Sequence, residues 1–235
     1  MANCIIASTS SLFGQQPLAY FKDTIQELYK GCRKVLFIPY ARPGGRTHDQ
    51  YTALVVPIFK ELGITLVGIH TFENAVQAIQ NTEAFYTGGG NTFMLVHQLY
   101  QNQLITKLKE EILKGKPYLG TSAGSNICGL TMQTTNDMPI VQPQSFKTLG
   151  ILPFNINPHY LDPNPDSTHN GETRETRIKE YHAFNTPPVI GLREGSWIKI
   201  KDEKITLQGK LTARIFEQNK TPYEITPETD VSFLK

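Results

Sequence analysis

The sequence is poor in cysteine, lacks long apolar runs and has no excess of one charge. Its 235 residues include only Cys4, Cys32 and Cys128, an odd number with no C-x-x-C spacing, so we expect free thiols in a reducing compartment. No apolar stretch approaches the roughly 18 residues that a membrane-spanning helix needs. Lys and Arg are scattered and the net charge is +2, so we expect neither a nucleic-acid nor a membrane partner.

Other signals are also missing. Residues 1–8 have no basic start followed by a long apolar run, so we expect a first strand there and not a secretion signal. No Pro/Ser/Gly-rich linker or charge block divides residues 1–235, which predicts a single domain. There is no metal-ligand spacing such as H-E-x-x-H. We therefore expect a cytoplasmic protein without a metal site, and both a monomer and a homodimer remain open.

Short apolar runs alternate with helical patterns along the first half of the chain. Runs that are apolar on both faces suit a parallel sheet covered by helices, so the predicted class is α/β with a mostly parallel sheet flanked by helices. After Val189 the pattern changes to short strands, expected as hairpins at the sheet edge or as a small antiparallel layer. Predicted strands are 4–8, 34–39, 64–69, 83–87, the run before Ser122, 189–192, 197–200, 204–207 and 214–216; predicted helices are 17–30, 51–62, 74–80, 92–101 and 104–114, with one more ending near Phe184.

Polar or glycine-rich loops follow four of the predicted parallel strands. In open sheets of this kind, sites form beyond the carboxyl ends of the strands. We therefore expect these loops to meet at one edge and to build a single site. They are residues 8–11, 40–49, 88–91 and the turn at Ser122.

The turn at Ser122 carries the motif G-x-S-x-G, with Gly120 and Gly124 on either side. This motif is typical of a sharp strand-to-helix turn that holds a nucleophilic serine at its tip. The glycines lack Cβ atoms, so backbone and helix can pass close to the serine. Because the motif also arises by chance in Gly/Ser loops, its meaning depends on partners elsewhere.

A nucleophilic serine needs a base that is itself held by a third group. His159 is the favoured base, because Pro158 restricts the backbone just before it and suits a fixed ring at a strand end. Two acids are candidates for the third group, Asp137 in T-T-N-D-M-P and Glu194 in L-R-E-G. The sequence leaves both open, and either could instead be a turn residue or bind a substrate amine. The other histidines are His48, His70, His97, His169 and His182, of which His70 and His97 are expected to be structural.

Two further segments suggest substrate contacts. The loop G-G-G-N at 88–91 lacks the full pattern of a phosphate loop, and its better interpretation is an oxyanion hole. Gly88 or Gly89 would then share the oxyanion with the Ala123 N–H. In the charged helix start at 172–177, Arg174 or Arg177 could bind a substrate carboxylate with its forked guanidinium. A plain glycine connection and a solvated helix start are the alternatives.

These motifs together resemble the peptidase E family, serine peptidases that are also related to cyanophycinase. The matches are ordered, similarly spaced and spread from the first strand to about Trp197, while the last 35 or so residues match weakly. The segments that carry the resemblance are 88–93 (G-G-G-N-T-F), 122–126 (S-A-G-S-N), 134–141 (T-T-N-D-M-P-I-V), 156–159 (I-N-P-H), 171–175 (G-E-T-R-E) and 189–192 (V-I-G-L).

The resemblance implies a fold similar to class I glutamine amidotransferases and hydrolysis of dipeptides with N-terminal aspartate, without metal or cofactor. Ser122 would be the nucleophile and His159 the base. Family descriptions name either Asp137 or Glu194 as the third member, and the order nucleophile, His, Glu favours Glu194. Arg174 is our hypothesis for the aspartyl carboxylate, with Asn91 as a further substrate contact.

The chain departs from the family pattern in two places. Its loop at 42–46 is unusually basic, and Arg193 and Ser196 stand where Pro and Asn are expected around Glu194. These departures bear on specificity more than on catalysis. The alternative functions are an isoaspartyl- or cyanophycin-type peptide hydrolase and a non-catalytic binding protein on the same fold.

Overall fold

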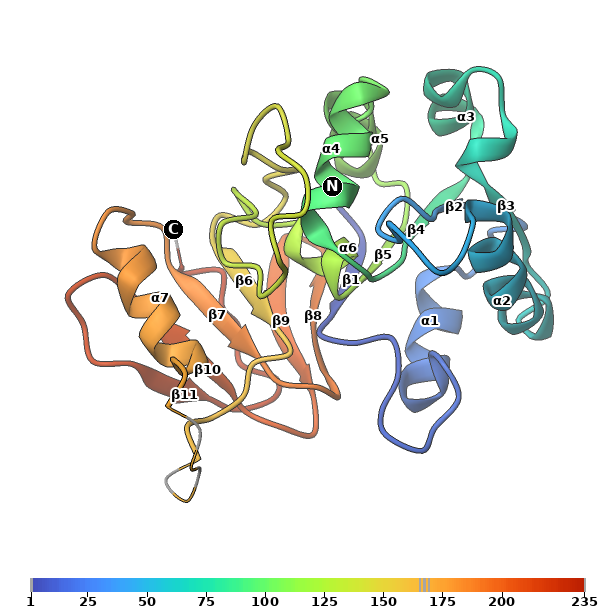
Figure 1. Ribbon diagram of the computed structural model, residues 1–235. Helices are drawn as coiled ribbons and strands as arrows, with labels where there is room; N and C mark the ends of the chain where they lie inside the picture. The colour runs from blue at the N-terminus through green and yellow to red at the C-terminus, as the bar shows by residue number, and fades with distance from the viewer. Residues whose placement is uncertain (1, 165, 167, 169, 235) are drawn as a thin grey trace.

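The computed structural model describes residues 2–164, 166, 168 and 170–234. A large sheet forms its centre, in the order β3-β2-β4-β5-β1-β8-β9 (Figure 1). The first five of these strands run parallel, and β8 and β9 add an antiparallel hairpin beside β1. The strands are β1 (Cys4–Ala7), β2 (Lys34–Ile38), β3 (Thr65–Gly68), β4 (Ala84–Thr87), β5 (Tyr118–Thr121), β8 (Ser196–Lys201) and β9 (Lys204–Gly209).

Helices cover both faces of this sheet because its central parallel strands carry apolar residues on both faces. In β1, Cys4 and Ile6 face one cluster, while Ile5 and Ala7 face the other. The helices on one face contribute to the first cluster, and those on the other face contribute to the second. The helices are α3 (Ala75–Asn81), α4 (Thr92–Gln101) and α5 (Ile105–Leu113) on one face, and α1 (Lys22–Leu28) and α2 (His48–Glu61) on the other. The predicted mostly parallel sheet flanked by helices is confirmed.

A second, smaller sheet has the order β11-β10-β7-β6. Strands β6 and β7 are parallel, and the others pair antiparallel. Helix α7 (Arg174–His182) lies across this sheet, with Ile178 packed near Val189 and Phe216 (Figure 1). The four strands are β6 (Asn155–Pro158), β7 (Val189–Leu192), β10 (Ala213–Phe216) and β11 (Tyr223–Ile225).

Several predicted boundaries were wrong. The helix predicted from residue 17 begins only at Lys22, after a short 3-10 turn. Helix α2 begins at His48, inside the predicted loop, because Thr47 and Gln50 form a capping box there. For β6, only a strand end before His159 was predicted, without bounds, and β11 was not predicted; β7 pairs with β6 in the second sheet. All three thiols are free, as expected; Cys4 and Cys128 are buried, whereas Cys32 is half-buried.

The parallel register brings the carboxyl ends of the strands to one edge of the large sheet. Ile38 pairs with Thr87, and Ala7 pairs with Thr121. The loops that follow β1, β2, β4 and β5 therefore start side by side, as predicted. Within the described residues, no helix combines the length and the apolar character that crossing a membrane requires.

Candidate active site

Ser122 lies in a strained turn between β5 and the short helix α6 (Ala123–Asn126). Its φ of 55° and ψ of −112° place a non-glycine residue in a region that is rarely occupied. The neighbouring glycines are needed for close approach: a Cβ on Gly124 would lie 2.2 Å from the Thr87 carbonyl oxygen, and one on Gly120 would lie 2.4 Å from the Gly124 oxygen. The backbone around the serine is thus fixed by packing against β4 and α6.

His159 directly follows β6 and also has a positive φ, 54°. Its backbone N–H donates to the hydroxyl of Ser8 (2.8 Å), and that hydroxyl donates to the Leu192 carbonyl (2.7 Å). The Ser8 side chain is fully buried. It therefore joins the carboxyl ends of β1, β6 and β7 at the histidine.

Three side chains form a continuous hydrogen-bonded row. The Nε2 atom of His159 lies 2.8 Å from the Ser122 hydroxyl, and its Nδ1 atom lies 2.6 Å from a carboxylate oxygen of Glu194. A carboxylate can only accept, so Nδ1 carries the ring hydrogen and Nε2 is left to accept the serine proton. The His159 side chain is 35% exposed and that of Glu194 47%, so a substrate in solvent can reach the row.

Asp137, the other candidate acid, lies elsewhere. One of its oxygens accepts from the Thr92 backbone N–H (2.7 Å), at the first residue of α4, and from the Thr135 hydroxyl (2.9 Å). A carboxylate at a helix N-terminus is stabilised by the free N–H groups there. Among the described residues, its second oxygen has no protein donor, so it is available to a cation.

The segment around Asp137 is fastened to the strand that ends at His159. The Thr134 hydroxyl donates to the Ile156 carbonyl, and the Asn136 side chain donates to the Pro158 carbonyl. The buried Asn157 side chain donates back to the Thr134 carbonyl and to Asn136. The T-T-N-D motif thus holds the β6 end, and its aspartate faces α4.

The proposed oxyanion donors differ in availability. Gly89 lies against the serine, where a Cβ would come within 2.9 Å of the Ser122 Cβ. Gly88 already donates its N–H to the Ile38 carbonyl, although at a long 3.4 Å. In the described part of the chain, the N–H groups of Gly89 and Ala123 meet no protein acceptor, and the latter is an unpaired first N–H of a helix. The arrangement favours Gly89 and Ala123 over Gly88.

The structure also gives the surroundings of the remaining predicted residues. Asn91 caps α4 through its side-chain oxygen, and its side-chain amide donates to the Met138 carbonyl. Both contacts stabilise the structure, and the substrate-binding role of Asn91 stays a prediction.

Arg174 is half-buried. Burial and the nearby charge of Arg177 lower its pKa, whereas the charge of Asp137 raises it. Arg177 pairs loosely with Glu172 at 3.7 Å.

His169 lies outside the described residues, and His48, His70, His97 and His182 lie in or beside other helices. The described residues include no cluster of three or more His, Cys, Asp or Glu placed to hold a metal ion.

The sequence analysis placed residues 8–11 at this edge but assigned no role to Ser8. A buried hydroxyl that joins two strand ends has no recognisable sequence motif.

We expect Ser8→Ala to lower kcat by about 10- to 100-fold, because a small shift of the His159 ring away from Ser122 slows the reaction. It should also lower the free energy of unfolding by about 1–3 kcal/mol, because the His159 N–H loses its buried acceptor. Steady-state kinetics and urea unfolding measure both effects. Ser11→Ala, which removes a hydroxyl without a hydrogen bond among the described residues, is the control, and an unchanged kcat in Ser8→Ala would contradict the role.

A serine at a strained turn, bonded to a histidine that is bonded to a carboxylate, is the arrangement of serine hydrolases. Residues 4–208 match the model of peptidase family S51, and the chain belongs to this family. The predicted peptidase class and family resemblance are therefore confirmed.

The chain has relatives along nearly its whole length. It is 41% identical over 235 residues to a probable alpha-aspartyl dipeptidase of Drosophila melanogaster, covering 99% of this chain and 97% of that one. It is also 41% identical over 232 residues to a peptidase E of Streptomyces coelicolor, covering 99% and 94%. The similarity thus extends past the matched residues of the family model into the C-terminal strands.

Two solved structures share the fold. One is a putative peptidase E protein from Listeria monocytogenes, with a TM-score of 0.67 and 22% identity, covering 89% of this chain and 98% of that one. The other is a peptidase from an acI-B1 actinobacterium, with a TM-score of 0.71 and 17% identity, covering 99% and 97%. At these identities the likeness concerns the architecture alone.

Proposed function

We propose that this protein is a serine dipeptidase that hydrolyses dipeptides with an N-terminal aspartate. The observation that carries the proposal is the hydrogen-bonded row of Ser122, His159 and Glu194 at an exposed edge. Relatives that are 41% identical and are named alpha-aspartyl dipeptidase or peptidase E support the substrate class.

In the proposed mechanism, His159 takes the hydroxyl proton of Ser122 as the serine oxygen attacks the Asp–Xaa carbonyl. The Gly89 and Ala123 N–H groups hold the oxyanion, each contributing on the order of 3 kcal/mol to the transition state. His159 then gives its proton to the leaving amine as the peptide bond breaks. Water, deprotonated by the same ring, hydrolyses the acyl-enzyme and releases aspartate.

The substrate's own charges match two groups that lie near each other, Arg174 and Asp137. Arg174 has no carboxylate partner among the described residues, and it lies close enough to Asp137 for that charge to raise its pKa. We propose that Arg174 binds the aspartyl side-chain carboxylate with its guanidinium fork. The open oxygen of Asp137 would accept from the substrate's free amine. The two contacts together would require an aspartate with an unblocked N-terminus.

We further propose that the enzyme works as one domain in the cytoplasm. The two sheets contribute to one apolar cluster, which includes Ile6 of the large sheet and Ile190 of the small one. The free thiols of Cys4, Cys32 and Cys128 suit a reducing compartment.

A panel of peptides with EDTA present tests the proposal. We expect cleavage of Asp-Leu but not of Glu-Leu, Ala-Leu or N-acetyl-Asp-Leu, because only the first has both the right carboxylate reach and a free amine. Cleavage of β-Asp-Leu in place of Asp-Leu would move the protein to the isoaspartyl-type hydrolases. Cleavage of none of these peptides would overturn the proposed substrate class.

A further inference from the structure

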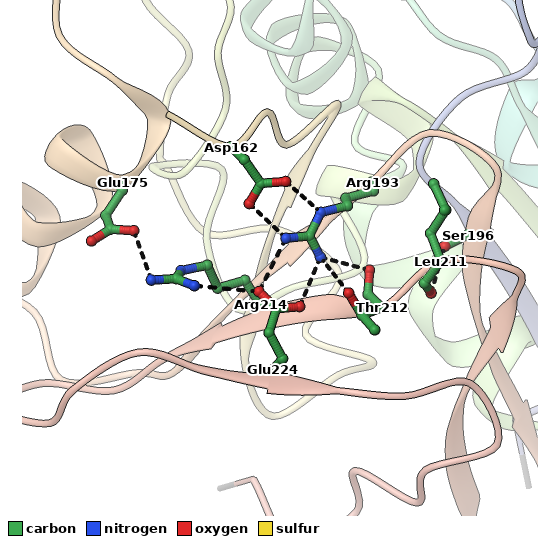
Figure 2. A network of polar contacts seen from close by, with 8 residues as sticks. All are labelled: Asp162, Glu175, Arg193, Ser196, Leu211, Thr212, Arg214 and Glu224. Carbon is green, nitrogen blue, oxygen red and sulfur yellow. Dashed lines mark hydrogen bonds and ion pairs between the residues drawn. The ribbon is translucent and has the colours of Figure 1, made fainter. Parts of the chain in front are cut away.

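Five charged side chains, those of Asp162, Glu175, Arg193, Arg214 and Glu224, form a network of ion pairs (Figure 2). Its centre is Arg193, whose side chain is only 15% exposed. The guanidinium donates two parallel bonds to Asp162 (2.8 and 2.6 Å) and two to Glu224 (2.9 and 3.0 Å). It also donates to the Thr212 carbonyl and hydroxyl and lies over the Tyr160 ring, 5.5 Å from its centre. A side chain with this many contacts is held in one place.

Arg193 and Asp162 each stand close in the chain to a member of the row. Arg193 directly precedes Glu194, and Asp162 follows His159 by three residues. The two segments leave adjacent parallel strands, where Pro158 pairs with Leu192. The Arg193–Asp162 ion pair therefore ties the two segments together just beyond the strand ends.

Glu194 has few other constraints. It lies in a tight turn in which the Ser196 N–H donates to the Arg193 carbonyl (3.1 Å), and Gly195 supplies the positive φ of 92° that such a turn uses. Among the described residues, the Glu194 carboxylate is hydrogen-bonded only to His159. The position of an exposed carboxylate on a four-residue turn depends on the residue that anchors the turn, which here is Arg193.

The network continues away from the row. Glu224 also contacts Arg214 at 3.4 Å, and Arg214 contacts Glu175 at 3.1 Å (Figure 2). Glu175 follows Arg174 in the first turn of α7. The second arginine thus supports the segment that carries the proposed substrate-binding residue and does not touch Asp162.

We propose that Arg193 is a positioning residue for catalysis, which through its ion pair with Asp162 sets the geometry between His159 and Glu194. The inference rests on the proposed function and adds to it a residue outside the row. Arg214 has a separate effect, because it holds Glu175 beside Arg174 and so acts on substrate binding.

The Arg193–Glu224 ion pair is intact at the pH of an ordinary assay. The hydrogen bonds from Arg193 lower the pKa of Glu224 from 4.5 to about 2. A depressed carboxylate pKa contributes stability above its ordinary value and loses it as the pH falls from about 4.5 toward 2. Kinetics near neutral pH therefore report on the paired state.

The test is a comparison of kcat and KM for Asp-Leu near neutral pH. We expect Arg193→Met to lower kcat by about 10- to 100-fold with KM within about threefold, because the reacting groups lose their geometry while the substrate contacts stay. Arg193→Lys keeps the charge but loses the fork, and should recover part of kcat. Arg214→Met should instead raise KM with kcat nearly unchanged. Lys201→Met, which removes an exposed cation paired with Glu27, is the neutral control.

A double-mutant cycle with Asp162→Asn separates positioning from general stability. The Asp162 side chain is 52% exposed, so we expect the Asp162→Asn variant to fold even if Arg193→Met does not. If Arg193 acts through Asp162, then Asp162→Asn lowers kcat on its own, and the double variant is no slower than Arg193→Met. Fully additive losses, or a wild-type kcat in both folded single variants, would overturn the inference.

A substrate-independent readout distinguishes failure of this inference from failure of the proposed function. The rate at which a fluorophosphonate labels Ser122 reports the activation of the serine alone. If the wild-type protein cleaves no Asp-Leu, slower labelling of Arg193→Met still supports the positioning role. Equal labelling rates in wild type and Arg193→Met would overturn it.

Discussion

Ser122→Ala should lower kcat for Asp-Leu by about 10⁵-fold or more, the loss seen when a catalytic serine is removed from such a unit. The change deletes the oxygen that lies 2.8 Å from His159 and leaves the Cβ that packs against Gly89. We therefore expect the free energy of unfolding to stay within about 1 kcal/mol of wild type. Turnover assays and urea unfolding of the same preparation measure the two quantities.

Ser125 offers a matched control in the same motif. Its fully buried hydroxyl bonds to the Ala7 and Gly120 carbonyls and does not reach His159. Ser125→Ala should therefore lower the free energy of unfolding by about 1 kcal/mol and leave kcat within about tenfold. Activity retained in Ser122→Ala, or lost equally in both variants, would remove Ser122 from the proposed role.

The second large effect is expected from the acid that holds the histidine. Glu194→Gln should lower kcat by about 10²- to 10⁴-fold, because the amide no longer favours the ring tautomer that accepts the serine proton. The lower end of this range is favoured, since the Glu194 side chain is 47% exposed and water can partly replace it. Steady-state kinetics on Asp-Leu measure the loss as a fall in kcat with little change in KM.

Asp137→Asn is the matched comparison, because it removes the other candidate carboxylate. Its carboxylate accepts from the Thr92 N–H at the start of α4 and from the Thr135 hydroxyl, and it makes no hydrogen bond to the His159 ring among the described residues. We expect kcat within about tenfold of wild type and a KM for Asp-Leu raised by about 10- to 100-fold, as for loss of a hydrogen bond to a charged amine. The reverse pattern, a large kcat loss in Asp137→Asn with Glu194→Gln nearly normal, would exchange the two roles.

The parallel part of the fold could be predicted because its strands are short runs that are apolar on both faces. The edge where their loops meet follows from the same pattern. Only the end of strand β6 was predicted, before His159; its extent and its partners were not, because Asn155 and Asn157 alternate with Ile156 and Pro158 as in a polar loop. Their amides are buried and bonded to Thr131, Thr134 and Asn136, so the strand depends on partners distant in the chain.

In the site, too, the residues marked by local motifs could be predicted, and those that depend on distant contacts could not. G-x-S-x-G and the I-N-P-H segment marked Ser122 and His159 by local chemistry. The choice between Asp137 and Glu194 depends on which carboxylate lies within hydrogen-bond distance of His159 Nδ1. A local sequence motif does not contain that distance. Ser8 and the Asp162–Arg193 pair were not assigned for the same reason, because each acts between segments 30 or more residues apart.

Labelling by a fluorophosphonate in the presence of Asp-Leu tests the central claim most directly. We predict one label per chain, mapped by mass spectrometry to the peptide that contains Ser122, with labelling slowed by Asp-Leu but not by Ala-Leu. His159→Ala should abolish rapid labelling, because the serine loses its base. An unlabelled Ser122, or labelling that Asp-Leu does not slow, would contradict the account.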